Sequence, residues 1–335
     1  MPSFNTSFRS CLCLLLALFS LMGAGCIKPK ITVFPDASEP LKEYVLQGSS
    51  KERILVISIK GFISESGKEF SLRRKPGTLQ EVVAQLKKAE KDGNIKAVIL
   101  KIDSRGGSVT ASDMLFHEIA AFKERTRVKV VAVIMGIAAS GGYYIALPAD
   151  CIVAHPTSIT GSVGVIFLRP NVSGLMDKIG LSVETDKSGK NKDMGSPFRK
   201  ATKDEEKIVQ EMIDGMAARF LDLVVAHRKL SDKAKADVAT ARIYVAADAL
   251  RLGLIDRIGY LDDVLRTTAQ MAGLGEDPSI VVYRRAEIHD DTYYNSSSMR
   301  PSDMPQINLI DLGLSEAVPP LLSGFYYLWL PGGPE

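Results

Sequence analysis

The chain is poor in the residue types that most often build catalytic triads and metal sites. Its 335 residues include four histidines, four cysteines and one tryptophan. The histidines, at positions 117, 155, 227 and 289, all lie outside the glycine-rich segments. A Ser-His-Asp triad therefore has no support in the sequence, although spacing alone does not exclude one. The cysteines show no paired spacing, so no metal site and no cofactor are predicted.

A strong excess of charge of one sign is also missing. The 42 basic and 39 acidic residues leave a net charge of +3. A nucleic-acid-binding surface normally needs a marked basic excess, so nucleic acid is not expected as a partner. The charged fraction of 24% and the hydrophobic fraction of 46% are ordinary for a globular protein. The length allows one large domain with tails or two small domains.

The N-terminal apolar run, Cys11 to Met22, is too short for a typical membrane-spanning helix. Arg9 precedes it and Gly23-Ala-Gly-Cys26 follows it, which is typical of an export signal. Cys26 is a candidate for lipid attachment, with cleavage after Gly25 or an uncleaved anchor as alternatives. In each case the rest of the chain lies outside the cytoplasm. We predict an export signal or anchor over 1–25 and a proline-containing tether over 26–50.

Apolar runs and helical patterns alternate along the middle of the chain. Strands are predicted at 53–60, 97–102 and 128–135, with amphipathic helices between them. One helix begins at a capping box, Thr78 to Glu81, and a later one at a second box, Thr202 to Glu205. This alternation predicts an α/β fold with a parallel sheet, whose functional loops lie at the carboxyl ends of the strands. Cys151, at the head of a further strand, is interpreted as a buried structural thiol.

Ser140 follows the third predicted strand in the sequence Ala-Ala-Ser140-Gly141-Gly142-Tyr-Tyr. Small residues on both sides leave its hydroxyl beside open backbone N–H groups, so Ser140 is a candidate nucleophile. The preceding strand ends in Gly106-Gly107, where missing side chains let backbone N–H groups approach a substrate. Gly107 and Gly141 are therefore candidate donors to an oxyanion. An ordinary glycine turn is the alternative.

Lysine is the strongest candidate to activate such a serine. Lys187, Lys190 and Lys192 lie close together downstream. A lysine acts as a general base once burial and neighbouring groups bring its pKa toward the working pH. A solvated basic loop is the alternative interpretation of this cluster.

Three segments in this order resemble the signal peptide peptidase A family, membrane-associated Ser/Lys proteases of the S49 type. They are Ala138-Ala-Ser140-Gly-Gly-Tyr-Tyr, Ile159-Thr-Gly-Ser162-Val-Gly-Val, and Lys187-Ser-Gly-Lys-Asn-Lys192-Asp-Met-Gly-Ser-Pro-Phe-Arg199. The resemblance covers roughly 53–259 and implies a ClpP/crotonase-like spiral fold of repeated ββα units. It implies Ser140 as the nucleophile, Lys192 as the general base with Lys190 as its rival, and Ser162 as the residue that orients the lysine. Arg105 stands where the family usually has proline.

The resemblance implies a membrane-associated serine endopeptidase that degrades cleaved signal peptides and other hydrophobic peptides outside the cytoplasm. It also implies a homo-oligomer. We expect the protease domain over 51–275 and a linker with an apolar tail over 276–335. The tail could dock on the domain, touch the membrane or occupy the protease groove as a self-substrate, and we favour docking. The alternative functions are a crotonase-like acyl-CoA enzyme and an inactive peptide-binding envelope lipoprotein.

Overall fold

The computed structural model describes residues 39–66, 76–275, 277–285, 287–288, 291–295 and 324–331. The predicted export signal, Cys26 and most of the predicted tether lie outside these residues. None of the helices within the described residues combines the length and the apolar character that crossing a bilayer requires.

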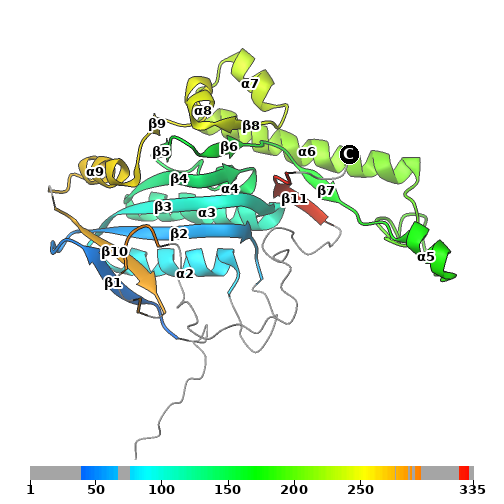
Figure 1. Cartoon of the computed structure of the whole chain (residues 1–335), viewed down its shortest axis with the longest axis horizontal. Coiled ribbons are helices and arrows are strands. Elements are labelled where there is room, and N and C mark those ends of the chain that lie inside the picture. The colour runs from blue at the N-terminus through cyan, green and yellow to red at the C-terminus, as the bar shows by residue number, and fades with distance from the viewer. Residues whose placement is uncertain are drawn as a thin grey trace, which may run out of the picture. The chain divides into compact units, whose positions relative to one another are not determined.

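One twisted sheet organises the described chain (Figure 1), and its main path runs β1-β10-β2-β3-β4-β5-β9. These strands are β1 (Lys42–Gln47), β2 (Arg53–Ile63), β3 (Ile95–Ser108), β4 (Lys129–Ala139), β5 (Cys151–Ala154), β9 (Arg257–Ile258) and β10 (Ser279–Arg284). All neighbouring pairs are parallel except β1 with β10. The parallel sheet and its three predicted strands are thus confirmed. Two of these strands extend well past their predicted carboxyl ends, to Ser108 and Ala139.

The helices of the described residues are α2 (Thr78–Lys91), α3 (Val109–Thr126), α4 (Gly141–Tyr144), α5 (Ser173–Ile179), α6 (Lys203–His227), α7 (Asp232–Val238), α8 (Ala246–Leu252) and α9 (Leu261–Met271). Of these, α2 and α3 connect neighbouring parallel strands as crossovers. Helix α3 shows why: Leu115, Ile119 and Phe122 recur on one side of it and are fully buried. That apolar stripe packs on the sheet and fixes the crossover between β3 and β4.

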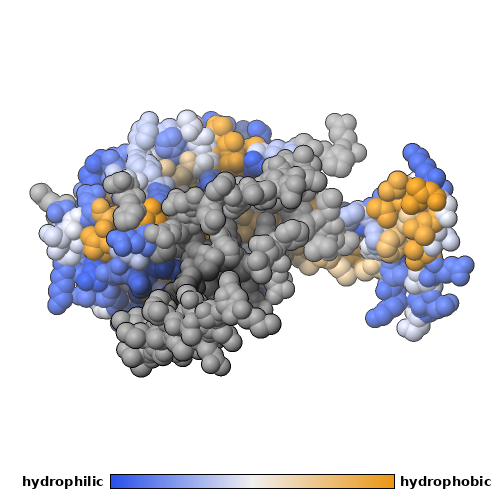
Figure 2. Space-filling view, turned by 60° about the horizontal axis from the view of Figure 1, so that its bottom comes forward, coloured by the Kyte–Doolittle hydropathy of each residue, from blue (hydrophilic) through white to orange (hydrophobic). Residues whose placement is uncertain are grey.

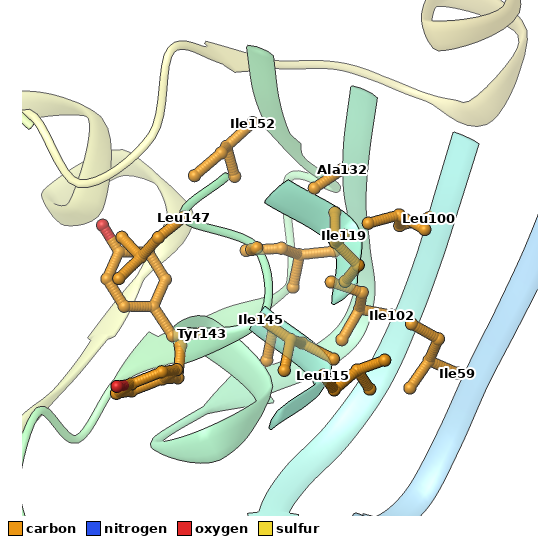
Figure 3. Close-up of a cluster of buried hydrophobic side chains, with 14 of the residues drawn as sticks. Ile59, Leu100, Ile102, Leu115, Ile119, Ala132, Tyr143, Ile145, Leu147 and Ile152 are labelled. Carbon is orange, nitrogen blue, oxygen red and sulfur yellow. The ribbon is translucent and has the colours of Figure 1, made fainter. Parts of the chain in front are cut away.

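Apolar side chains cover both faces of the central strands. On β2, Leu55 and Ile57 face the cluster formed with α2, α3, α4 and α6, whereas Ile54 and Val56 face the opposite cluster under α9. Figure 3 shows the first cluster, in which Ile59 and Leu100 from the strands meet Leu115 from α3. Burial on two faces explains the continuous apolar runs in the sequence.

The two predicted capping boxes have different outcomes. At α6, Thr202 Oγ1 accepts a hydrogen bond from the Glu205 amide, and Glu205 accepts one from the Thr202 amide, so this box is confirmed. At α2 the prediction is wrong, because the residue that caps the helix is Gly77. Thr78 instead donates its hydroxyl proton to the carbonyl of Phe62 at 2.9 Å, which ties the helix start to the end of β2.

The sheet extends past both expected boundaries of the protease domain. Strand β1 lies in the range assigned to the tether, and β10 lies in the range assigned to the C-terminal linker. Strand β10 pairs with β2, and β1 covers the outer edge of β10. Cys151 is buried on β5, as expected, and burial raises the pKa of its thiol.

At its carboxyl end, each of the strands β3 and β4 pairs with a further strand. Residues 137–139 of β4 pair with β6 (Ile159–Gly161), which in turn pairs with β8 (Ile243–Val245). Residues 106–108 of β3 pair with β11 (Gly324–Leu328), whose other edge pairs with β7 (Ile166–Leu168). The apolar tail thus docks on the domain through β11. Both glycine-rich segments lie where the sheet divides.

An arm leaves this region through β7 and α5 and returns to the start of α6 (Figure 1). It carries exposed apolar side chains, which Figure 2 shows as hydrophobic surface on the projecting part of the molecule. These are Leu175, Ile179, Leu181, Val183 and Phe198, each between 47% and 66% exposed.

Candidate active site

Ser140 stands at the turn between β4 and α4. Its backbone angles are φ 54° and ψ −118°, a conformation that side chains rarely adopt. Its amide donates to the carbonyl of Gly161 at 2.7 Å, which holds the turn against β6. A strained strand-to-helix turn of this kind presents a nucleophilic serine in other hydrolases. Strain held in place by surrounding structure is typical of functional sites.

The hydroxyl of Ser140 is weakly engaged. Among the described residues it donates to the carbonyl of Gly164, at 3.4 Å, which is long for an O–H···O hydrogen bond. The residue is 1% exposed. The hydroxyl is therefore held in position by the backbone, and its proton is available to a base.

Ser162 follows the end of β6, next to the strand end that carries Ser140. Ala139 and Gly161 are paired across β4 and β6, so the two serines follow directly from neighbouring strand ends. Ser162 also has a positive φ, 52°, and its amide donates to the carbonyl of Arg242. Two strained serines side by side make this strand end the most unusual backbone of the described chain.

The two glycine segments also meet here. A Cβ added to Gly141 would lie 3.1 Å from the amide nitrogen of Gly107 and 2.5 Å from Ser112 Oγ. The amide of Gly106 donates to Ser104 Oγ at 3.1 Å, which rigidifies the turn without the proline that is usual there. Gly107 and Gly141, the predicted oxyanion donors, are thus neighbours beside Ser140. A side chain at Gly141 would crowd the amide of Gly107, whereas one at Gly107 would meet the carbonyl oxygen of Ile63 at 2.0 Å.

Lys192 does not reach Ser140 within the described chain. It is exposed and lies in the arm between α5 and α6, whereas Ser140 caps α4 in the body of the sheet (Figure 1). Its rival, Lys190, is committed to an ion pair with Asp204 at 2.5 Å, and Lys187 to one with Asp193 at 2.7 Å. Of the three lysines, Lys192 is the one that makes no ion pair among the described residues.

A charged network fixes the segment that carries Lys192. Arg199 contacts Asp193 at 2.8 Å and Glu205 at 2.5 Å, and Glu205 is 2% exposed. Hydrogen bonds from Arg199 and then Lys187 hold the pKa of Asp193 far below its usual value. These ion pairs therefore hold Asp193, the neighbour of Lys192 in the sequence, close to the first turn of α6.

This network makes a pH-dependent contribution to stability. Hydrogen bonds from Arg199 and from the Thr202 amide lower the pKa of Glu205 from 4.5 to about 2. Because the folded pKa is the lower one, the contribution is complete above pH 4.5 and disappears as the pH falls toward 2. Thermal unfolding between pH 7 and pH 2 should show a smaller loss of Tm on acidification for Glu205→Gln than for the wild type.

The matched control for this prediction is Glu211→Gln. Glu211 lies on the same helix, is 66% exposed, and pairs with Lys207 only at 3.9 Å. Its variant should follow the wild-type curve, since exposed pairs contribute little. Parallel curves for all three proteins would contradict the assigned role of Glu205.

Two of the described histidines, His155 and His227, are engaged elsewhere. His155 shares a hydrogen bond with Thr157 at 2.9 Å, and His227 packs its ring edge-on against Phe116. Burial lowers the pKa of His227, which favours its neutral form. The Ser140 amide and hydroxyl donate to the carbonyls of Gly161 and Gly164, and its carbonyl accepts from the amides of Tyr143 and Tyr144; among the described residues, none of these partners is a histidine.

An aromatic cluster around Tyr144 of α4 was missed by sequence reasoning. Tyr144 contacts Phe116 and Phe220 at ring-centroid distances of 5.4 and 4.8 Å, and Phe220 comes from α6. The Tyr144 hydroxyl donates to Asp113, which Arg219 also contacts at 2.7 Å. Burial first, and then the bond to Asp113, raise the pKa of Tyr144. The Tyr-Tyr pair after Ser140-Gly-Gly indicated aromatic packing at this place, but the sequence did not indicate that α6 would pack against it.

Comparison with family models gives two matches. The model of peptidase family S49 matches residues 122–275, and the Clp protease model matches residues 73–158. The second range contains the crossover unit from α2 to the end of β5, and it identifies the sheet as a ClpP-like α/β fold, as the sequence predicted.

Three curated relatives are similar over long stretches. A protein of Enterococcus faecium described as "Putative signal peptide peptidase SppA" is 34% identical over 265 residues, which cover 79% of this chain and 75% of the relative. "Putative protease MJ0651" of Methanocaldococcus jannaschii is 40% identical, over 58% of this chain and 61% of the relative. "Protease 4" of Haemophilus influenzae is 30% identical over 78% of this chain but only 42% of its own length.

Proposed function

Because the chain belongs to peptidase family S49, the serine-type peptidases that include signal peptide peptidase A, we propose that it is a Ser/Lys endopeptidase acting on hydrophobic peptides at a membrane. The observation that carries the proposal is the strained Ser140 turn with Gly107 and Gly141 beside it. This arrangement supplies a nucleophile and two backbone donors in one place, as acyl transfer requires.

The chemistry follows from this geometry. Neutral Lys192 takes the proton of the Ser140 hydroxyl, whose oxygen attacks a peptide carbonyl carbon. The N–H groups of Gly107 and Gly141 stabilise the negative oxygen of the tetrahedral intermediate. Lys192 then gives the proton to the leaving amine as the C–N bond breaks. Water hydrolyses the resulting acyl-enzyme by the same proton transfers in a second round.

We propose that the lysine of each site comes from a second copy of the chain. Lys192 lies in the exposed arm, and the single chain leaves it apart from Ser140. The same arm exposes an apolar surface that includes Leu175 and Ile179, as an interface between copies would require. Burial against a second copy would remove water from the Lys192 amine and favour its neutral form. The predicted homo-oligomer thereby becomes a condition of catalysis.

Membrane association and substrate class rest on the sequence and on the family. The apolar run ending at Met22 and the following Gly-Ala-Gly-Cys26 support an export signal with a membrane or lipid anchor. An anchored peptidase outside the cytoplasm meets cleaved signal peptides and other apolar fragments of membrane proteins. We propose these as the substrates.

Cleavage of an apolar peptide by the purified full chain, compared with a Gly141→Ala variant, tests the proposal. A Cβ at Gly141 would stand 2.5 Å from Ser112 Oγ, so the segment must shift and move its N–H away from the oxyanion. We expect kcat to fall about 100-fold, the usual cost of losing one such donor. Mass spectrometry of the products measures the rate.

The matched control is Gly215→Ala. Gly215 lies within α6 with open space around it, so a methyl group there meets no other atom within 4 Å. Its variant should cleave the peptide at the wild-type rate. Equal rates for all three proteins, or hydrolysis of a coenzyme A thioester in place of the peptide, would refute the proposed oxyanion site.

A further inference from the structure

Strand β4, which lies between β3 and β5 in the sheet, contains a bulge (Figure 1). Its residues 131–134 pair with β5, and its residues 137–139 pair with β6. Against β3 the register shifts at Asp103, where residues 135–137 of β4 stand opposite this single residue. A bulge bends a strand and re-aims the side chains that follow it. Here it redirects β4 toward β6, and Ser140 comes directly after the redirected end.

The carboxylate of Asp103 reaches into this bulge. Its Oδ1 atom accepts a hydrogen bond from the amide of Ile137 at 3.1 Å. A Cβ added to Gly136 would stand 2.7 Å from the same oxygen, so the carboxylate fills the space that a side chain at Gly136 would need. Bulges take backbone amides out of the regular ladder, and each of these amides needs another acceptor. Asp103 supplies that acceptor and thereby holds the bulge in one arrangement.

A second bulge begins at the same residue of β3. Lys60 of β2 is opposite Asp103, and the next pair is Phe62 opposite Gly106, so β3 holds one residue more than β2 over this interval. The oxyanion segment, Gly106 and Gly107, follows this second bulge. Both strands thus leave the regular sheet at Asp103, β3 toward the oxyanion donors and β4 toward the nucleophile.

The two segments pack closely beyond the bulges. Ser104, the neighbour of Asp103 in the sequence, donates to the carbonyl of Gly61 at 2.6 Å and accepts from the amide of Gly106 at 3.1 Å. A Cβ added to Gly142 would stand 2.5 Å from the carbonyl oxygen of Ser104. Packing this close transmits a displacement from one segment to the next. A shift of β4 at its bulge therefore changes where the serine turn stands relative to the oxyanion segment.

We propose that Asp103 is a positioning residue for peptide cleavage, which fixes the end of β4 so that the Ser140 hydroxyl stands correctly beside the oxyanion donors. The inference rests on the proposed function and adds a residue that does not touch the reacting atoms. A misplacement of reacting groups by about 1 Å costs about 100-fold in rate. Loss of the Asp103 acceptor should therefore lower kcat about 100-fold and leave KM within about threefold, because the misplaced groups act in the transition state.

Peptide cleavage by Asp103→Leu and Asp103→Asn in the full chain tests this role. Leucine is similar in size but cannot accept from the Ile137 amide, whereas asparagine keeps an acceptor oxygen. We expect the full loss of kcat in the leucine variant and a kcat within about fivefold of the wild type in the asparagine variant. Mass spectrometry of the products measures both rates.

The matched control is Asp150→Leu. Asp150 Oδ2 accepts from the amide of Val130 at 2.9 Å, which is the same kind of bond at the opposite end of β4. This variant should lower Tm and leave kcat unchanged, because the lost bond is far along the strand from the serine turn. An equal loss of kcat in Asp150→Leu and Asp103→Leu would overturn the inference.

Gly136→Ala displaces the carboxylate without removing it and covers the case in which Asp103→Leu does not fold. The new methyl group would meet Asp103 Oδ1, which is the end of a side chain and moves more easily than backbone. We expect kcat to fall about 100-fold here too. Gly93→Ala is the control, since Gly93 lies in the turn before β3 with no other atom within 4 Å of the added Cβ. Wild-type cleavage by folded Gly136→Ala and Asp103→Leu would overturn the inference.

Amide hydrogen exchange separates this inference from the proposed function, because it needs no catalysis. Residues 137–142 should exchange at least about tenfold faster in Asp103→Leu and Gly136→Ala than in the wild type, and residues 151–154 of β5 should not change. Unchanged exchange over 137–142 in the folded variants would overturn the inference. If the exchange responds as expected but the wild type cleaves no peptide, the positioning of the turn by Asp103 stands and the proposed catalytic chemistry fails.

Discussion

Replacing Ser140 with alanine is expected to reduce peptide cleavage by about 10⁴-fold or more, the usual cost of removing a nucleophile that acts with its base as a unit. The turn at Ser140 is held in place by its backbone and not by the hydroxyl, because the Ser140 amide donates a hydrogen bond of 2.7 Å to the carbonyl of Gly161. The hydroxyl makes one long contact of 3.4 Å, so its loss should cost less than about 1 kcal/mol of unfolding free energy. Cleavage rates and denaturant melts measure the two effects.

A Ser140→Gly variant sharpens this test, because it separates strain from chemistry. Glycine adopts the positive φ of 54° without the steric cost that serine bears. We expect the glycine variant to be inactive and yet about 1 kcal/mol more stable than the alanine variant. A serine-reactive phosphonate probe should label the wild type and neither variant. Cleavage that survives in Ser140→Ala would show that another residue is the nucleophile.

Replacing Lys192 with alanine is expected to lower kcat by about 10²- to 10⁴-fold, the contribution of a positioned general base. Lys190→Ala is the matched control, because Lys190 belongs to the same segment but pairs with Asp204 on the surface. Its variant should stay within about twofold of the wild type, as expected for a surface pair.

Mixing two inactive variants tests whether the lysine comes from a second copy. Ser140→Ala retains Lys192, and Lys192→Ala retains Ser140, so a mixed assembly contains some sites with both groups. We expect the mixture to recover a measurable part of the wild-type rate after the subunits have exchanged. Mixtures that exchange subunits but stay inactive would show that both groups of each site belong to one chain. An equal loss of kcat in Lys190→Ala and Lys192→Ala would contradict the assignment of Lys192 as the general base.

Local sequence patterns predicted the parallel strands of the fold and the candidate site residues that directly follow them. The apolar runs at 53–60, 97–102 and 128–135 are parallel strands because they are buried on both faces, and Ser140 and Gly107 follow two of them. The box at Thr202 was predictable because its partners are three residues apart. The box at Thr78 had the same pattern, but the distant carbonyl of Phe62 competes for the threonine hydroxyl. Local signals fail where a tertiary contact takes the same group.

The sequence by itself determined the candidate nucleophile, Ser140, because a glycine-flanked serine after a buried strand specifies its turn through local residues. The sequence also determined the family and the order of the family's motifs. Tertiary structure alone decided that β6 pairs with the end of β4 next to Ser140, that Phe220 packs against Tyr144, and that β11 pairs with β3. It also placed the segment between α5 and α6, which carries Lys192, on the arm that projects from the sheet (Figure 1). The reason is physical: strand register, pocket walls and the direction of an arm depend on contacts between residues far apart in the chain, and no local pattern encodes them.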